Sequence, residues 1–211
     1  MRLPHAPDLL DTLRIATVAD PLRLLMSGCL VGLPCGVDGS DYDLAKTTAG
    51  LLALPNVHAI PFCPEHYGIG TPRTMPDIHG GDGFDVLDGR ARVLDEHGVD
   101  LTGQMLFGAR GMLAHAQTHR AELAIMTDMS AACGSQVISF GCRLVEKREF
   151  TASVGVATAL LLRNGFHVVS QRDNRTMGRL RARLDTTFIP DPAAVDYHEC
   201  DWYTGQFIPG P

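Results

Sequence analysis

The stretch "RLLMSGCLVGLPCGVDGSD" (23–41) joins a short apolar run to a glycine-rich loop that holds two cysteines. An apolar run of this length, bounded by polar and glycine-rich residues, is typical of a buried β-strand. Cys29 follows the run, and Cys35 lies too far beyond it to form the C-x-x-C pair of a redox or zinc motif. The stretch therefore predicts a buried strand that ends in a loop carrying ligand or reactive thiols.

Three further runs share this character, and helical patterns separate them. The runs are "VHAIPF" (57–62), "LAIMT" (123–127) and "HVVSQ" (167–171). Helical spacing of apolar residues and helix-end signals occur in the intervening stretches 41–54, 102–120 and 152–166. Such alternation is typical of an α/β domain with a mostly parallel sheet and right-handed crossovers. We therefore predict this fold class, without a strand order.

Three smaller predictions concern parts beside this alternation. The stretch "FDVLDGRARVLDEHG" (84–98) predicts a small β-hairpin insertion with Asp88-Gly89 at its turn. Thr102 is the expected N-cap of the helix that follows. Residues 186–211 are rich in proline and aromatic residues and lack periodicity, so we expect an extended C-terminal tail packed over the domain.

Size, composition and charge limit the class of protein. At 211 residues, with 45% hydrophobic and 20% charged residues, the chain is expected to form one globular domain, 1–211. No apolar run approaches the ~20 residues of a membrane span, and residues 1–21 lack the apolar core of a secretory signal, so we expect a cytoplasmic protein. The net charge of −6 argues against non-specific binding to nucleic acid. The arginines between positions 172 and 183 are expected to form a solvated helix face rather than a binding patch.

The six cysteines are expected to be free, because a reducing compartment disfavours disulfides. Cys29, Cys63 and Cys133 each follow one of the first three predicted strands. The carboxyl ends of parallel strands gather at one edge of an open sheet, where ligands bind. We therefore predict that these three thiols meet at one site.

A site of three thiols suits two kinds of metal group. Structural zinc takes four ligands, usually from paired C-x₂₋₄-C knuckles, which this sequence lacks, but a catalytic zinc needs only three protein ligands. The other thiolate-rich choice is an iron–sulfur cluster. A [4Fe–4S] cluster held by three cysteines leaves one iron free to bind a substrate atom as a Lewis acid. The residues alone leave both choices open.

Two polar side chains are expected at the same edge. Glu65 lies two residues after Cys63, with Pro64 between them, and Ser130 lies three residues before Cys133. A carboxylate and a hydroxyl beside an electrophilic centre can relay a proton or orient a water molecule. The alternative is that Glu65 is a surface carboxylate and that Ser130 only caps a helix or turn.

Five segments of the chain match one known family in order: "SGCLVGLPCGVDG" (27–39), "FCPEHYGIGTPR" (62–73), "GVDLTGQMLFGA" (98–109), "MSAACGS" (129–135) and "GVATALLLRNGF" (155–166). The specific signal is the joint pattern of C-L-x-G-x-x-C, then C-P-E…T-P-R, then S-x-x-C-G. With these motifs the chain resembles the DUF523 family, whose best-understood members are the thiouracil desulfidases. The resemblance covers about 23–171 and leaves 172–211 as a C-terminal extension.

The resemblance implies a Rossmann-like α/β domain with a [4Fe–4S] cluster on Cys29, Cys63 and Cys133 and one iron without a protein ligand. It implies a desulfidase that acts on a small thiolated pyrimidine such as 4-thiouracil. The open iron would take the thiocarbonyl sulfur, water would attack the ring carbon, and sulfur would leave as sulfide without net redox change. Glu65 and Ser130 match the positions of the family's catalytic carboxylate and hydroxyl.

Departures from the family pattern bear on the substrate more than on the cluster. The usual S-P-S-C-G has become "SAACG" (130–134), and a lysine usual just upstream of the serine is absent. Cys35 is the weaker candidate for a ligand, because relatives often replace it. Cys142 and Cys200 match no family motif. Arg73 of the retained T-P-R is expected to line the pocket, either itself or through the backbone of this motif.

Two other functions stay open at this point. The chain could be a non-catalytic protein that binds a metal or cluster through three cysteines or handles sulfide, or a desulfidase of thiolated tRNA. The acidic net charge and the lack of an appended domain count against tRNA. His66, His79 and His97 are expected to be solvated rather than ligands. Monomer and dimer are equally compatible with the sequence.

Overall fold

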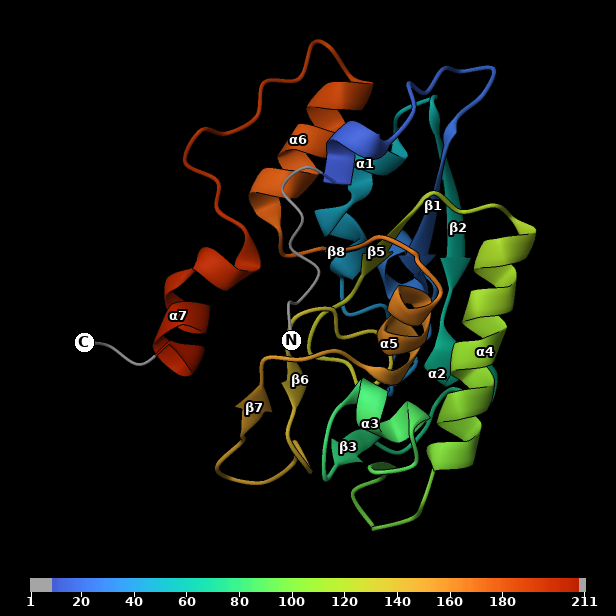
Figure 1. The fold of residues 1–211 in the computed structure, drawn as a ribbon, viewed down its shortest axis with the longest axis vertical. Coiled ribbons are helices and arrows are strands. Elements are labelled where there is room, and N and C mark those ends of the chain that lie inside the picture. Colours follow the sequence, from blue (N-terminus) through green and yellow to red (C-terminus); the bar gives the residue numbers. More distant parts are fainter. Residues whose placement is uncertain (1–8, 209–211) are drawn as a thin grey trace.

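The computed structural model of the chain describes residues 9–208, so the start of the stretch assessed for a secretory signal and the last residues of the predicted tail lie outside it. Its centre is a four-stranded parallel sheet in the order β2-β1-β5-β8 (Figure 1). The strands are β1 (Leu22–Ser27), β2 (Val57–Phe62), β5 (Leu123–Met126) and β8 (Val168–Ser170). The four predicted strands and the mostly parallel sheet are therefore confirmed.

Helices cover both faces of this sheet, which makes a three-layer α/β fold (Figure 1). The helices involved are η1 (Leu9–Thr12), α1 (Ala49–Leu52), α4 (Thr102–Thr118), α5 (Val156–Arg163) and α6 (Asn174–Leu184). Successive side chains of a strand point to opposite faces. Leu24 and Met26 of β1 accordingly pack in the core that includes η1, α1 and α6, whereas Leu25 packs with α4 and α5.

The strand β2 is less buried than its apolar sequence indicates. It forms one edge of the sheet, and within it only Ile60 is fully buried. Pro61 has no N–H to donate to a ladder, which an edge strand tolerates. A run of apolar residues therefore predicted the strand correctly but not its place in the sheet.

Two of the predicted helices differ in detail from expectation. The predicted helix 41–54 is broken into η3 (Leu44–Thr47) and α1, and the hydroxyl of the intervening Thr48 donates to the Leu30 carbonyl. The helix α4 is confirmed, but its N-cap is Leu101. The hydroxyl of Thr102 instead accepts a hydrogen bond from the backbone N–H of Val93 at 3.0 Å.

The predicted hairpin with Asp88-Gly89 at its turn is wrong. Residues before this turn form α3 (Gly83–Leu87), because Asp82 and Asp85 make a reciprocal capping box at its start. A two-stranded antiparallel insertion does exist, but it pairs β3 (Asp77–His79) with β4 (Arg92–Leu94), and α3 lies in the connection.

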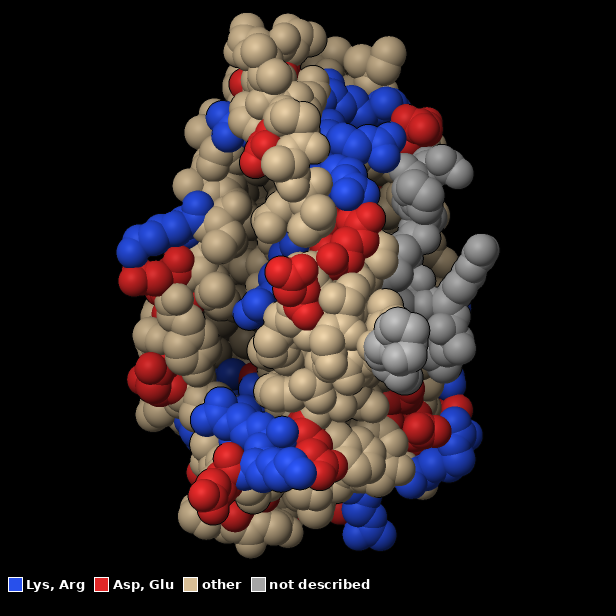
Figure 2. Space-filling model, turned by 90° about the vertical axis from the view of Figure 1, so that its left-hand side faces the viewer, with Lys and Arg blue, Asp and Glu red and all other residues tan. Residues whose placement is uncertain are grey.

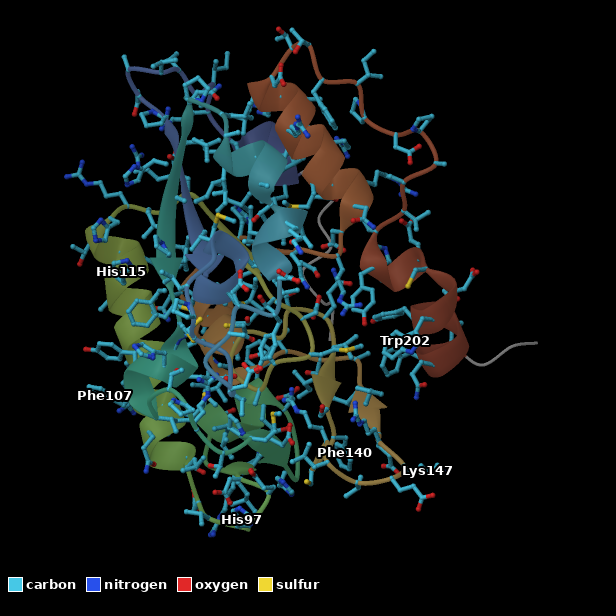
Figure 3. The ribbon with its side chains drawn as sticks, turned by 180° about the vertical axis from the view of Figure 1, so that it is seen from behind. His97, Phe107, His115, Phe140, Lys147 and Trp202 are labelled. Carbon is cyan, nitrogen blue, oxygen red and sulfur yellow. The ribbon has the colours of Figure 1, made fainter. Side chains whose placement is uncertain are left out.

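The C-terminal extension is not an extended tail throughout. After α6, residues 185–196 form no helix or strand, and the chain then enters η4 (Tyr197–Glu199) and α7 (Asp201–Phe207). Tyr197 and Tyr203 pack with Val137 in a separate aromatic core. Figure 3 shows Trp202, whose ring stacks on that of Tyr197, on α7 across the molecule from His115 on α4. The aromatic residues of the tail thus pack it against the segment around Val137 and Phe150, without needing a helical repeat.

The arginines of the extension, which were expected to form a solvated helix face, have acidic and aromatic neighbours. Arg175 pairs with Glu199 at 2.8 Å, while Arg172 and Arg181 lie over aromatic rings. Figure 2 shows acidic side chains interspersed with basic ones on this face of the molecule. Within residues 9–208, no helix combines the length and apolar character needed to cross a membrane.

Candidate active site

The carboxyl ends of the parallel strands lie at one edge of the sheet. Ser27 pairs with Phe62, and Met126 pairs with Ser170, so the loops after all four strands leave from the same side. The strand order reverses at β1, which has β2 on one side and β5 on the other. Such a switch point opens a crevice between the diverging loops. A cavity of about 300 Å³ lies here, lined in part by the loops after β1, β2 and β5.

All the candidate site residues predicted from the sequence line this cavity: Cys29, Cys35, Cys63, Glu65, Ser130 and Cys133. Arg73 lines it as well, as expected from its motif. Much of the remaining wall is apolar and is formed by Val37, Leu44, Met75, Pro76 and Met129. Cys142 and Cys200 are not among the lining residues, and all six cysteines are free.

The first loop brings both of its cysteines to the cavity. Cys29 lies on η2 (Gly28–Val31), directly after β1, and its Sγ is 3.0 Å from Thr127 Oγ1. The turn ends at Gly32, whose φ of +83° favours glycine, and the chain then folds back. A Cβ on Gly28 would lie 3.1 Å from Cys35 Sγ, so a glycine here leaves room for the second thiol.

The second loop places Cys63 at the N-cap of α2 (Pro64–Gly68), where its Sγ accepts a hydrogen bond from the His66 N–H at 3.3 Å. Glu65 consequently lies in the first turn of a short helix. This helix packs against α4 at very close range, since a methyl group at Gly108 would collide with the Pro64 carbonyl oxygen. The contact fixes the depth at which Glu65 enters the cavity.

The third loop is folded around the hydroxyl of Ser130. This oxygen accepts hydrogen bonds from the backbone N–H groups of Ala132 (3.2 Å) and Cys133 (2.9 Å). The backbone N–H groups in the first turn of α5 donate to carbonyls of the loop that follows Ser130. One of these bonds joins Val156 N to Ala131 O at 2.9 Å. Ser130 thus has the capping role named as the alternative, and it also faces the cavity.

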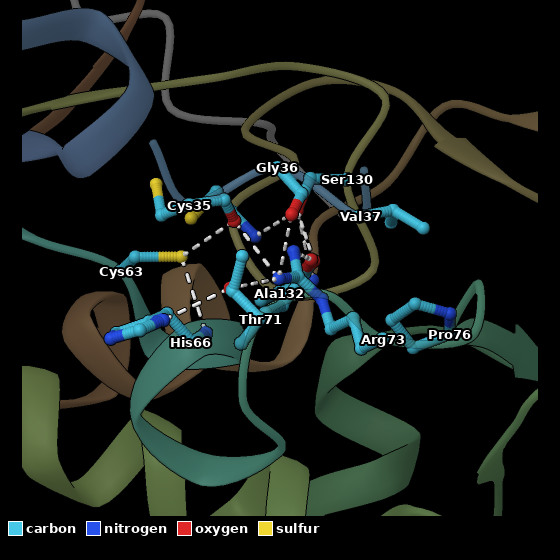
Figure 4. Close-up of polar contacts among 12 residues, drawn as sticks. Cys35, Gly36, Val37, Cys63, His66, Thr71, Arg73, Pro76, Ser130 and Ala132 are labelled. Atoms are coloured by element: carbon cyan, nitrogen blue, oxygen red, sulfur yellow. Dashed lines mark hydrogen bonds and ion pairs between the residues drawn. The ribbon is translucent and has the colours of Figure 1, made fainter. Parts of the chain in front are cut away.

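Glu65 connects the second and third loops. The Ser130 hydroxyl donates to Glu65 Oε1 at 2.9 Å, and the Arg73 guanidinium forms an ion pair with Oε2. The side chains of Arg73 and Glu65 are only 4% and 12% exposed, so each is the other's main counter-charge. Arg73 Nη1 also donates to the Cys35 carbonyl at 2.9 Å, which ties the first loop to this pair (Figure 4).

The thiols differ in how readily they ionise. Hydrogen bonds from the Cys35 thiol lower the pKa of Cys29 and that of Cys63, and the same contacts raise the pKa of Cys35. Burial raises the pKa of Cys133 well above its ordinary value, and the charges of Cys63 and Glu65 raise it further. A thiolate is the form that binds metals. The joint ionisation of these thiols therefore requires a positive group among them.

The donor set fits an iron–sulfur cluster better than a single ion. Among residues 9–208, no three His, Cys, Asp or Glu side chains are arranged to enclose one metal ion. The cavity instead has thiols on three separate loops, and soft thiolates are the ligands of iron–sulfur clusters. A cluster has several irons, so its cysteines need not converge on one point.

The three histidines do not line the cavity. His66 and His97 are exposed, as expected, and His66 Nδ1 lies 2.9 Å from Thr71 Oγ1. His79 departs from expectation, because it is half-buried and its Nε2 has no hydrogen-bond partner within the described chain.

Sequence reasoning missed two residues that shape the site. The carboxylate of Asp128 accepts the backbone N–H groups of Ser135, Gln136 and Val137, which closes the loop that carries Ser130 and Cys133. Arg143 reaches the cavity from the segment between β6 (Ile138–Ser139) and β7 (Phe150–Thr151). Asp128 directly follows Thr127 at a strand end and could have been found there, but nothing in the sequence near Arg143 indicates its role.

Comparison with known proteins gives three matches. Residues 24–173 match the family model described as 2-thiouracil desulfurase. An uncharacterised protein of Bacillus subtilis (strain 168), YbbK, is 34% identical over 151 residues, which cover 71% of this chain and 96% of that protein. The solved structure of the [4Fe–4S]-dependent thiouracil desulfidase TudS is similar with a TM-score of 0.55 and 27% identity, over 71% of this chain and 90% of that one.

Proposed function

The chain belongs to the 2-thiouracil desulfurase family, and we propose that it is a [4Fe–4S]-dependent desulfidase that hydrolyses the carbon–sulfur double bond of a small thiolated pyrimidine such as 4-thiouracil. The observation that carries the proposal is the convergence of cysteines from three loops on one cavity that also holds Glu65 and Ser130. The likeness to TudS, a [4Fe–4S]-dependent enzyme, supports the choice of cofactor.

In this proposal Cys29, Cys63 and Cys133 hold the cluster, and one iron has no protein ligand. Cys35 stays a thiol and donates hydrogen bonds to its neighbours, which agrees with the raised pKa of Cys35 and the lowered pKa values of Cys29 and Cys63. When bound, the cluster would supply a Lewis-acidic iron that attracts the thiocarbonyl sulfur and polarises the carbon–sulfur bond.

Glu65 and Ser130 carry the proton transfers. Arg73 occupies Oε2 of Glu65, so Oε1 is the oxygen available to accept a proton from an attacking water, directly or through the Ser130 hydroxyl. The water oxygen bonds to the ring carbon, the carbon–sulfur bond breaks, and both protons of the water leave with sulfur as hydrogen sulfide. Atoms and charge balance without an oxidant or a reductant.

The cavity suits a small planar base. In this proposal the cluster and the substrate share the cavity of about 300 Å³, which leaves room only for a small base, and the partly apolar wall is typical of small-molecule sites. Leu44, Met75 and Met129 can pack against the faces of a ring, and the cavity also offers polar groups such as Glu65 and Ser130. Free thiols suit a reducing compartment, and we place the protein in the cytoplasm.

Two measurements test this function. Anaerobically prepared protein is incubated with 2-thio- and 4-thiopyrimidines and their nucleosides, and sulfide release is scored. The reaction of an active substrate is then run in H₂¹⁸O, where hydrolysis places one ¹⁸O in the product carbonyl. Release of sulfide without ¹⁸O in the product would contradict hydrolysis, and iron-loaded protein inert towards every compound would favour a non-catalytic, sulfide-handling role.

A further inference from the structure

The cavity has a second arginine, Arg143, that the mechanism above does not use. We propose that Arg143 is a positioning and specificity residue, which holds the Ser130 loop in place and donates hydrogen bonds to the ring carbonyl oxygen of the bound pyrimidine. The proposal rests on the proposed function, because it names the part of the substrate that the site recognises besides sulfur.

Asp77 fixes Arg143 through two separate hydrogen bonds. The Arg143 Nε donates to Asp77 Oδ1 at 2.6 Å, and the Arg143 backbone N–H donates to Oδ2 at 2.8 Å. The Asp77 side chain is 2% exposed, and Asp77 begins the β3 strand of the antiparallel insertion. Charge-assisted bonds of this kind are short and directional. The guanidinium is therefore held at a defined place in the cavity wall.

The same guanidinium holds the residue before Ser130. Arg143 Nη1 donates to the Met129 carbonyl oxygen at 2.9 Å. Met129 has a φ of +60°, a backbone conformation that residues other than glycine seldom adopt without support. Its N–H is bound at the same time by the Val137 carbonyl at 3.0 Å. Arg143 thus helps to keep the backbone in the geometry that turns the Ser130 hydroxyl toward Glu65.

Arg143 also has donors left for a ligand. A guanidinium carries five N–H groups. Asp77 and the Met129 carbonyl take two of them, and the Pro76 carbonyl takes a third at 3.4 Å, which leaves one on each terminal nitrogen. Arg73, the other arginine of the cavity, has its Nη1 taken up by Thr71 and backbone carbonyls and its Nη2 bound to Glu65, while its unpaired Nε is buried. The Arg143 side chain is 21% exposed against 4% for Arg73, so Arg143 is the arginine whose spare donors a ligand can reach.

A thiolated pyrimidine with a ring carbonyl fits this arrangement. Its sulfur lies toward the cysteines, and its oxygen is the acceptor that a guanidinium at the Met129 side of the cavity would bind. The neighbouring wall at Met75, Pro76 and Met129 provides no other side-chain donor. A base without this oxygen would leave the Arg143 donors unpaired, which is costly in a buried site.

The test measures ligand binding, so that it does not depend on turnover. Dissociation constants of uracil and of pyrimidin-4-one, which lacks the second ring oxygen, are measured by calorimetry on cluster-loaded protein. Arg143→Met should weaken uracil binding about 10- to 100-fold and leave pyrimidin-4-one nearly unchanged. Arg143→Lys should recover only part of the difference, because an ammonium cannot reproduce the planar fork. Arg163→Met, which removes an exposed pair with Asp88, is the matched control.

The positioning role has its own readout. Arg143→Met should lower kcat for pyrimidine-4-thione as well as for 4-thiouracil, because the displaced Ser130 loop serves both substrates. The inference would be overturned if Arg143→Met lost affinity equally for uracil and pyrimidin-4-one, or if it bound uracil as wild type does. Sulfide release by wild type would still uphold the proposed function in that case. If wild type binds uracil more tightly than Arg143→Met but releases no sulfide from any substrate, the inference is supported and the proposed function is wrong.

Discussion

The Ser130 hydroxyl donates a 2.9 Å hydrogen bond to Oε1 of Glu65, although the two residues come from loops after different strands. Arg73 pairs with the other oxygen of the same carboxylate. The hydroxyl oxygen also accepts hydrogen bonds from two backbone N–H groups, so its single proton is directed at Glu65. The pair is therefore pre-oriented to pass a proton to or from a molecule in the cavity.

We expect Glu65→Gln and Ser130→Ala each to lower the rate of sulfide release by about 10²- to 10⁴-fold, the usual contribution of a general acid–base group. Neither residue is a proposed ligand, so iron content should stay as in wild type. The rate and the iron content are measured on the same samples. Glu146→Gln, in an exposed loop, is the control and should have no effect. A wild-type rate in either site variant would remove that residue from the mechanism.

The iron content of cysteine variants distinguishes the cluster ligands from the other thiols. After anaerobic reconstitution, wild type and Cys35→Ser should hold about four irons per chain, whereas Cys29→Ser, Cys63→Ser and Cys133→Ser should hold far less. The physical reason is that the contacts with Cys29 and Cys63 and burial raise the pKa of Cys35, which disfavours the thiolate that binds iron. Cys142→Ser, outside the cavity lining, is the matched control. An iron-free Cys35→Ser beside an iron-replete Cys29→Ser would reverse the assignment in the first loop.

The close contact of α2 with α4 gives a test of how Glu65 is placed. Gly108→Ala puts a methyl group against the Pro64 carbonyl, so we expect a loss of about 1 to 3 kcal/mol in the free energy of unfolding. The displaced α2 should also lower activity. Gly103→Ala lies on the same helix with nothing within 4 Å, and should be neutral or stabilise by up to about 1 kcal/mol. Equal stability of the two variants in urea unfolding would contradict the contact.

The sequence predicted the parallel strands and the meeting of Cys29, Cys63 and Cys133, because both depend on short-range patterns. A short apolar run bounded by polar residues is typical of a buried strand, and parallel strands bring the loops that follow them to one edge of the sheet. Glu65 and Ser130 were predicted at the same edge because each lies close to a cysteine in sequence, and the family motifs added their expected catalytic role.

The errors have a common physical origin in tertiary contacts and local caps. Asp82 and Asp85 turn the stretch before Gly89 into a helix, although its Asp-Gly pair favoured a hairpin. The last stretch forms α7, and its aromatic residues pack with Val137. The spacing of apolar residues in the sequence does not predict this contact. Arg143 enters the cavity from an irregular loop, and its hydrogen bonds to Asp77 and to the Met129 carbonyl hold it there.

The link between the C-terminal extension and the sheet should make stability depend on pH. Burial raises the pKa of Asp173 to about 6, against 3.8 for an ordinary carboxyl, while its oxygens accept the Tyr197 N–H and the Gln136 amide. The folded state binds this proton more tightly, so the contribution of Asp173 to stability is fully present below about pH 4 and is lost as the pH rises through 6.

The matching variant is Asp173→Asn, which cannot titrate. We expect the free energy of unfolding of wild type, relative to the variant, to fall by up to about 3 kcal/mol between pH 4 and pH 7. Guanidinium unfolding at several pH values measures it. A difference between the two proteins that stays constant over this range would show that Asp173 has an ordinary pKa in the folded state.

Sulfide release from 4-thiouracil by anaerobically purified protein, compared before and after removal of iron with a chelator, tests the proposed function most directly. We predict that the iron-loaded protein is brown and produces sulfide and uracil in equal amounts, and that the iron-free protein produces neither until iron and sulfide are restored. Equal rates from loaded and iron-free protein would contradict a cluster-dependent desulfidase.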